Sequence, residues 1–178
     1  MIGRTILVAA AAAGALSGIA FAQSPYAGLQ ARPIKALSEQ QIADLRAGRG
    51  MGLALPAELN GYPGPMHVLE LAGPLALSDA QRAAVERQFE AMKVESIPIG
   101  ERLIEQEAVL DQLFAARTAT ADNVAAAVAA IAETQGALRN AHLRYHLTTL
   151  ALLQTDQVER YARLRGYGDG NPRPHRDH

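Results

Sequence analysis

The sequence of 178 residues contains no cysteine and no tryptophan, and aromatic residues make up only 4% of it. Without cysteine, the chain can form neither a disulfide, nor a thiolate metal site, nor a catalytic thiol. A packed β-sheet is rich in β-branched and aromatic residues, whereas alanine, leucine, glutamate, glutamine and arginine dominate here. The composition therefore predicts an all-α protein.

A strong excess of one charge is also lacking, because the formal net charge is −1. Nucleic acid and anionic membranes attract proteins with a large positive excess, so we expect the chain to bind neither. The sequence contains no glycine-rich phosphate loop, no G-x-S-x-G and no H-E-x-x-H motif. We therefore expect a non-catalytic protein without an organic cofactor. A carboxylate cluster that works as an acid and a base is the alternative.

The first residues have the pattern of a secretory signal. Arg4 precedes an uncharged apolar run from Ile6 to Ala22, which closes with Ala20-Phe21-Ala22. A retained membrane anchor is the alternative, but the run is shorter than the ~20 apolar residues that a spanning helix needs. We predict that residues 1–22 are a signal peptide, cleaved after Ala22, and that the mature chain is exported.

The rest of the chain divides into three predicted parts. Residues 23–64 are predicted to be an irregular segment with one short helix, which begins after Ser38 and ends at Gly48. Proline and glycine residues interrupt the remainder of that segment. Residues 65–167 are predicted to be a helical-hairpin domain, and residues 168–178 a disordered tail.

Two long stretches of helical periodicity predict the hairpin. In the first, which follows Ser78, the apolar residues at helical spacing are Val85, Phe89, Met92, Ile99, Leu103, Leu110 and Leu113. Pro98 interrupts this stretch and predicts a bend near Glu95. The second follows Thr120, with a heptad-like stripe of Val124, Val128, Ile131, Gln135, Leu138, His142, Tyr145, Thr149 and Leu152. Two long helices joined by a few residues fold back on each other as an antiparallel hairpin.

Short helices are predicted on either side of this hairpin. One runs from Pro65 to about Ala72, with proline at the first helical position, and another runs from Thr155 to Arg165. The seam of the hairpin is rich in alanine and buries little apolar area per residue. Because a second copy would complete such a thin core, we predict a homodimer.

Four residues are candidate metal ligands: His67, Glu70, His142 and His146. His142 and His146 lie one helical turn apart, so a helix presents both imidazoles to one transition-metal ion. His67 and Glu70 are candidates for a third and a fourth ligand. Imidazole and carboxylate suit zinc, nickel, cobalt or copper(II). In the alternative interpretation, His142 packs in the seam of the hairpin and His146 is a surface residue.

Short motifs at three helix starts resemble a known family. Leu37-Ser38-x-x-Gln41 and Leu77-Ser78-x-x-Gln81 resemble the LTxxQ motif of the periplasmic Spy/CpxP chaperone group. A third copy is Leu153-Gln154-Thr155-Asp156-Gln157, with glutamine in place of the threonine of the motif. The resemblance covers residues 37–167 and extends to the related heavy-metal resistance and sensor proteins, such as ZraP and CnrX.

The resemblance implies a four-helix hooked hairpin that forms a dimer in the periplasm. Members of the group protect unfolded envelope proteins without ATP, bind metal and signal to a membrane sensor or anti-sigma partner, or inhibit an envelope-stress sensor kinase. From Asp79 to Asp111 this hairpin carries eight acidic and four basic residues, unlike the cationic cradle of Spy-like chaperones. We therefore expect a periplasmic metal-binding sensor or resistance protein, with a holdase chaperone or a kinase inhibitor as the alternative.

Overall fold

The computed structural model describes residues 25–167, so the predicted signal peptide, residues 1–22, and the predicted tail, residues 168–178, lie outside the described residues. The described part of the chain is helical and contains no β-strand, which confirms the all-α prediction. Its elements are η1 (Leu29–Ala31), α1 (Glu39–Arg46), α2 (Leu55–Glu58), α3 (Pro65–Glu70), α4 (Asp79–Ala115), α5 (Ala121–Leu150) and α6 (Thr155–Arg165).

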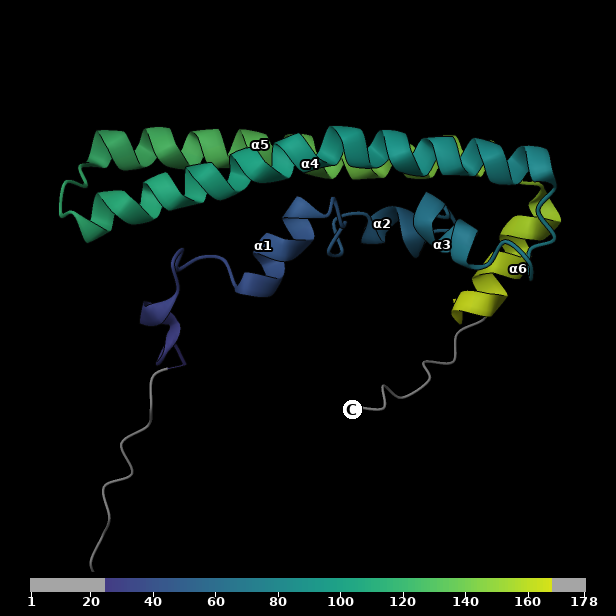
Figure 1. Cartoon of the computed structure of the whole chain (residues 1–178), viewed down its shortest axis with the longest axis horizontal. Helices are drawn as coiled ribbons and strands as arrows, with labels where there is room; N and C mark the ends of the chain where they lie inside the picture. Colours follow the sequence, from purple (N-terminus) through teal and green to yellow (C-terminus); the bar gives the residue numbers. More distant parts are fainter. Residues whose placement is uncertain (1–24, 168–178) are drawn as a thin grey trace, which may run out of the picture.

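The long helices α4 and α5 pack against each other along their lengths as the predicted antiparallel hairpin (Figure 1). The short helices α1, α2 and α3 follow one another along one side of this hairpin, and α6 lies across its open end (Figure 1). Helices α1 and α3 contact α4, while α2 and α3 contact α5. The short helices therefore cover the open-end half of the hairpin. No helix within residues 25–167 is both long and apolar enough to cross a membrane.

The segment expected to be irregular, residues 23–64, contains α2 and η1 in addition to the one helix that the sequence predicts. Helix α2 carries Pro56 in its first turn. Proline is tolerated there because the N–H groups of a first helical turn have no partner within the helix. The same proline that indicated irregular structure in the sequence is thus compatible with a one-turn helix.

Capping boxes begin the helices at the first two motif copies. Ser38 Oγ accepts a hydrogen bond from Gln41 N (3.2 Å), and Gln41 Oε1 accepts one from Ser38 N (2.9 Å). Ser78 and Gln81 repeat this exchange at the start of α4. These bonds satisfy backbone donors that a helix leaves free at its N-terminus, which explains the serine–glutamine spacing.

The glutamines of the second and third motif copies also bind each other. Gln81 Nε2 donates to Gln157 Oε1 (2.8 Å), and Gln157 Nε2 donates to Gln81 Oε1 (3.1 Å). Gln81 Nε2 also donates to the carbonyl of Leu152, and Gln157 Nε2 to that of Leu75. This amide pair joins the beginnings of α4 and α6, which lie 76 residues apart.

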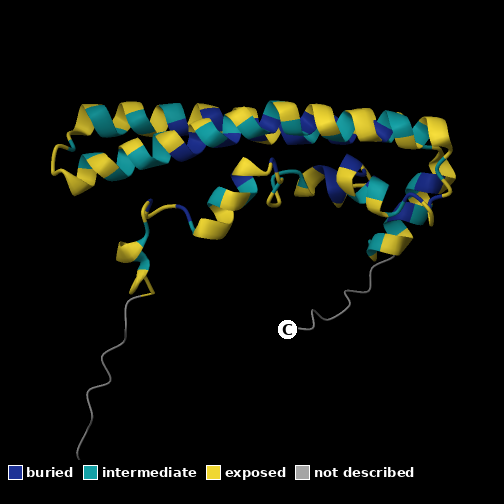
Figure 2. Cartoon of the chain, viewed as in Figure 1, coloured by how far each residue is buried: buried dark blue, intermediate teal, exposed yellow. Residues whose placement is uncertain are grey.

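Two apolar clusters hold the short helices against the hairpin. The first, here the mid-hairpin cluster, consists of Ile34, Leu37, Leu45, Leu103, Ile104, Ile131 and Leu138. The second, here the base cluster, consists of Val68, Leu75, Val85 and Tyr161 at the open end. Buried residues gather on the inner face of the hairpin and on α2 and α3 (Figure 2).

The predicted stripe of α5 is buried over only part of its length. Ile131, Leu138 and Tyr145 are buried, and between the first two the neighbouring Thr134 is buried in place of Gln135. Val128, closer to the tip, is 49% exposed. The tip of the hairpin lies beyond the short helices, so the stripe there meets α4 alone (Figure 1). Heptad spacing identifies the face of a helix, while the helices that cover this face decide whether it is buried.

Helix α4 continues through Pro98 without interruption. Figure 1 shows that α4 changes direction near its middle, as expected for a helix that contains a proline. Close by, a Cβ atom added at Gly100 would lie 2.7 Å from the carbonyl oxygen of Leu45. Gly100 therefore allows the end of α1 to pack directly against α4.

Candidate functional site

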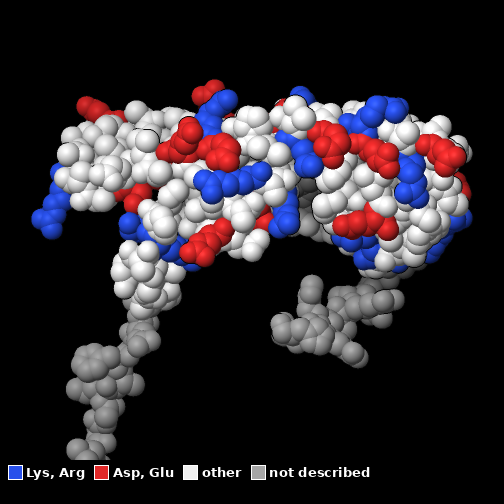
Figure 3. All heavy atoms as spheres, viewed as in Figure 1, with Lys and Arg blue, Asp and Glu red and all other residues white. Residues whose placement is uncertain are grey.

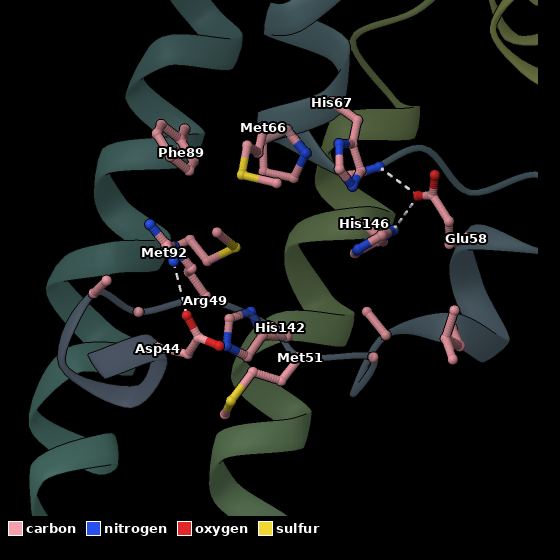
Figure 4. A pocket seen from close by; sticks show the side chains of 18 of the residues that line it. Asp44, Arg49, Met51, Glu58, Met66, His67, Phe89, Met92, His142 and His146 are labelled. Atoms are coloured by element: carbon pink, nitrogen blue, oxygen red, sulfur yellow. Dashed lines mark hydrogen bonds and ion pairs between the residues drawn. The ribbon is translucent and has the colours of Figure 1, made fainter. Parts of the chain in front are cut away.

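A pocket of about 620 Å³ opens between the hairpin and the short helices. Along α4 and α5 it lies between the mid-hairpin cluster and the base cluster. Each of the three histidines within residues 25–167, namely His67, His142 and His146, lines this pocket (Figure 4). The structure thus brings the three predicted histidines to one cavity, with two contributed by α5 and one by α3.

His146 is buried, with 8% of its surface exposed, so the interpretation as a surface residue is wrong. Its Nδ1 lies 2.6 Å from the backbone carbonyl oxygen of Tyr62. A carbonyl oxygen only accepts hydrogen bonds, so Nδ1 carries a proton, and in the neutral ring Nε2 carries the lone pair. A Cβ atom added at Gly64 would lie 2.9 Å from this Nε2, so the lack of a side chain at Gly64 lets the ring fit.

Glu58 lies beside His146 and was not identified from the sequence. The residue is 6% exposed, and its Oε2 accepts a hydrogen bond from Gly64 N (3.3 Å) and lies 3.7 Å from His146 Nδ1. Its Oε1 accepts a hydrogen bond from the Tyr161 hydroxyl and lies 3.6 Å from Arg165 Nε. Burial, followed by the hydrogen bond to Glu58, raises the pKa of Tyr161 and keeps this hydroxyl a donor.

His142 is 3% exposed, and its Nε2 is buried without a hydrogen-bond partner. Burial, followed by the charge of His146, lowers the pKa of His142 from its ordinary value of 6.5. The imidazole is therefore neutral near pH 7. A buried polar atom without a partner costs about 1–3 kcal/mol, and a bound ligand or water molecule would remove this cost.

His67 and Glu70 form a pair at the surface end of the pocket. His67 Nδ1 lies 2.9 Å from Glu70 Oε2, and the two side chains are 28% and 56% exposed. Glu70 is not among the residues that line the pocket. The carboxylate instead holds the proton on Nδ1 of His67, so that in the neutral ring the lone pair is on Nε2, as carboxylates commonly do for metal-bound histidines.

Oxygen and nitrogen donors alone do not complete a ligand set. Within residues 25–167, no group of three His, Cys, Asp or Glu side chains is arranged so that it could hold a metal ion. Asp44 lines the pocket, but its carboxylate forms an ion pair with Arg49 (2.8 Å). Any ion in the pocket therefore needs a donor of another kind or a shift of the side chains.

Methionine supplies such donors. All three methionines within residues 25–167, Met51, Met66 and Met92, line the pocket. The sulfur atoms of Met66 and Met92 are turned into the space between α4, α5 and α3, while the sulfur of Met51 points away from them, beyond His142 (Figure 4). In the sequence, Met92 belongs to the predicted apolar stripe of the first long helix, and no pattern there indicates a role for Met51 or Met66.

Comparisons with protein-family models, with curated proteins and with solved structures found no significant match for this chain. The resemblance to the LTxxQ group thus continues to rest on the three motif copies and on the expected hairpin.

Proposed function

We propose that the protein is a metal-binding sensor or resistance protein of the bacterial periplasm and that the pocket of His67, His142 and His146 holds the metal ion. The state of the imidazole nitrogens is the observation that carries this proposal. His67 and His146 each have Nδ1 paired with an oxygen, so in the neutral rings the lone pair is on Nε2. His142 presents a buried nitrogen without a partner. Metal ions bind neutral imidazole, and oxygen partners on the second nitrogen orient such ligands.

The position of the pocket supports a signalling role. His67 belongs to α3, whereas His142 and His146 belong to α5. An ion shared between these helices would stabilise α3 against the hairpin, and this difference in affinity between two arrangements is what turns binding into a signal. The LTxxQ resemblance supplies the expected setting: an exported homodimer with a membrane sensor or anti-sigma protein as its partner.

The holdase alternative has less support. Lysine and arginine side chains alternate with aspartate and glutamate over the face in Figure 3, and no broad cationic surface covers that face. Large apolar residues are exposed on both long helices, among them Val94, Val109, Phe114 and Leu147. They are spread over distant turns, whereas a cradle for unfolded chains needs one continuous apolar surface.

The proposal is tested by calorimetric titration of the chain from residue 23 onward, stripped with a chelator. Zinc, nickel, cobalt and copper(II) are titrated, together with copper(I) under reducing conditions. We expect stoichiometric binding of at least one ion, lost in His142→Ala/His146→Ala. His67→Ala serves as a second variant, since His67 lies at the pocket rim and its loss leaves the core intact. Replacement of His175 and His178 controls for binding by the terminal histidines.

Binding no tighter than roughly 100 μM, about 5.5 kcal/mol, for every ion would contradict the proposal. The same holds if the pocket variants bind as tightly as the unmodified chain. In either case, suppression of the aggregation of a denatured client by the metal-free protein becomes the next measurement.

A further inference from the structure

The donors in the pocket differ from those of a site for a divalent ion that prefers nitrogen and oxygen. Besides the imidazoles, the thioethers of Met66 and Met92 face the space between α4, α5 and α3 (Figure 4), and neither sulfur has an ionic partner. Met92 is 6% exposed and Met66 is 38% exposed, so the first is a buried donor and the second lies at the rim.

The carboxylates that line the pocket are already paired with cations or hydrogen-bond donors. Asp44 forms an ion pair with Arg49, and Glu58 binds the Tyr161 hydroxyl beside Arg165. Little negative charge remains to balance an added cation. A divalent ion in a partly desolvated site would leave more charge unbalanced than a monovalent ion would.

The thioether donors and the lack of unpaired carboxylates in the pocket favour the same ion. Thioether sulfur is a soft ligand that prefers Cu(I), while imidazole binds copper in either oxidation state. Zinc, nickel and cobalt gain little from neutral thioethers. Cu(I) has a single positive charge, so it is compatible with a pocket whose carboxylates are occupied.

We infer that the ion taken by this pocket is Cu(I), bound by the thioethers of Met66 and Met92 together with the imidazoles of His142 and His146. His67, at the rim, is a ligand for a divalent ion and is not one of the four Cu(I) donors. This inference rests on the proposed metal-binding function and names the ion. It also accounts for the absence of a complete set of His, Cys, Asp and Glu ligands within residues 25–167, because two of the four donors are sulfur atoms of methionine.

The test is a competition between the chelator-stripped chain and a coloured Cu(I) chelator, such as bicinchoninate, in the absence of oxygen. The variant is Met66→Leu/Met92→Leu, because leucine keeps the volume and apolar character of methionine but removes the sulfur. Met51→Leu is the matched control, since its sulfur points away from the other two (Figure 4). Circular dichroism verifies that each variant is folded.

We expect the unmodified chain to take Cu(I) from the chelator and the double variant to lose about 100-fold or more in Cu(I) affinity, more than the loss of an outer hydrogen-bond partner commonly costs. Met51→Leu should change it by less than about threefold, within the spread expected of a volume-conserving swap. Affinity for copper(II) or zinc should be unaffected by the loss of the thioethers. X-ray absorption at the copper edge should show sulfur neighbours that disappear in the double variant.

The outcomes separate this inference from the proposed function. If the chain binds zinc, nickel, cobalt or copper(II) through its histidines but not Cu(I), the Cu(I) inference is overturned while the metal-binding function stands. It is also overturned if the double methionine variant binds Cu(I) like the unmodified chain. If no ion binds, Cu(I) included, both proposals fail.

Discussion

Each of the two sides of the pocket contains a buried histidine, but only one of the two rings has a hydrogen-bond partner. On one side, here the His146 side, the imidazole is tied to the Tyr62 carbonyl and lies next to Glu58. On the other, here the His142 side, the imidazole is equally buried, but its Nε2 has no partner. One helical turn separates the two histidines, so the difference comes from the segments that pack against α5.

This contrast separates structural support from ligand binding. The His146 side joins three elements, because Glu58 belongs to α2, His146 to α5 and Tyr161 to α6. Substitutions there should affect stability as well as metal binding. The His142 side consists of the end of α1, the loop after it and methionine side chains, so substitutions of its exposed residues should change stability little. The predictions below test this difference, from the largest expected effect to the smallest.

Loss of the carboxylate on the His146 side should have the largest effect. Glu58→Ala is expected to lower the free energy of unfolding by about 3–5 kcal/mol, because Tyr161 and Arg165 would lose their buried acceptor. The matched change on the His142 side is Asp44→Ala, which breaks an ion pair with the exposed Arg49 and should cost no more than about 1 kcal/mol. Urea denaturation of both variants measures the difference. Equal losses would mean that the two sides do not differ in structural importance.

A methyl group added on each side gives a second paired test. In Gly64→Ala the new Cβ would lie 2.8 Å from His146 Cε1, and the ring cannot retreat without breaking its bond to the Tyr62 carbonyl. We expect a loss of about 1–3 kcal/mol from overpacking.

The corresponding change on the other side is Gly50→Ala, whose Cβ would lie 3.4 Å from His142 Nδ1, an ordinary contact. Its stability should stay within about 1 kcal/mol of the unmodified chain, because alanine also restricts the unfolded state. Thermal melts of both variants decide the question. A tolerated Gly64→Ala would show that the His146 ring is free to move.

His67 repeats the His146 arrangement at the surface, with a carboxylate in place of a carbonyl. Glu70→Gln should weaken the binding of a divalent ion, for which His67 is a third ligand, by about tenfold, because the amide holds the proton on Nδ1 less strongly. Stability should change by less than about 0.5 kcal/mol, since the Glu70 side chain is 56% exposed. Calorimetric titration measures the affinity, and Glu86→Gln on the exposed face of α4 controls for the loss of one negative charge. If both variants lose the same metal affinity, Glu70 does not orient the His67 ring.

Local signals were sufficient to predict most of the fold. Thr120 caps α5 as expected, and α6 runs from Thr155 to Arg165 as predicted, with Gly166 in the left-handed conformation after it. Capping side chains and glycines act within a few residues, so they can be recognised in the sequence. Helix α2 was missed because the proline and glycine residues around it suggest a loop, whereas Pro56 is compatible with a first turn.

The sequence could predict the site only where its residues lie within one or two turns of the same helix. The spacing of His142 and His146 on one helix is such a case. Glu58 was missed because its partner Tyr161 lies 103 residues away, and no sequence pattern connects the two. The thioethers of Met66 and Met92 were missed for the same reason, since helix packing alone brings α3 and α4 to one pocket.

The smallest expected effect concerns pH and again distinguishes the two sides. Burial, followed by the charge of His146, lowers the pKa of His142 below its ordinary value of 6.5. Between the lowered pKa of His142 in the folded chain and its ordinary pKa in the unfolded chain, the unfolded chain binds more protons. Stability therefore increases with pH in this window. The contribution of His142 is therefore complete above about pH 6.5 and is lost as the pH falls through 6.5 toward the folded pKa.

Melting temperatures of the metal-free chain, measured from about pH 8 to about pH 5, test this dependence. His142→Leu should flatten the decline on the acid side, because leucine cannot take up the proton, whereas His67→Leu at the exposed rim should retain it. Asp44, Glu58 and His146 line the same pocket, so the difference between the curves, not the decline itself, measures the share of His142. If melting temperature falls with pH equally in the unmodified chain and in His142→Leu, another group takes up the proton that destabilises the fold. The two histidines would then not differ in their effect on the pH dependence of stability.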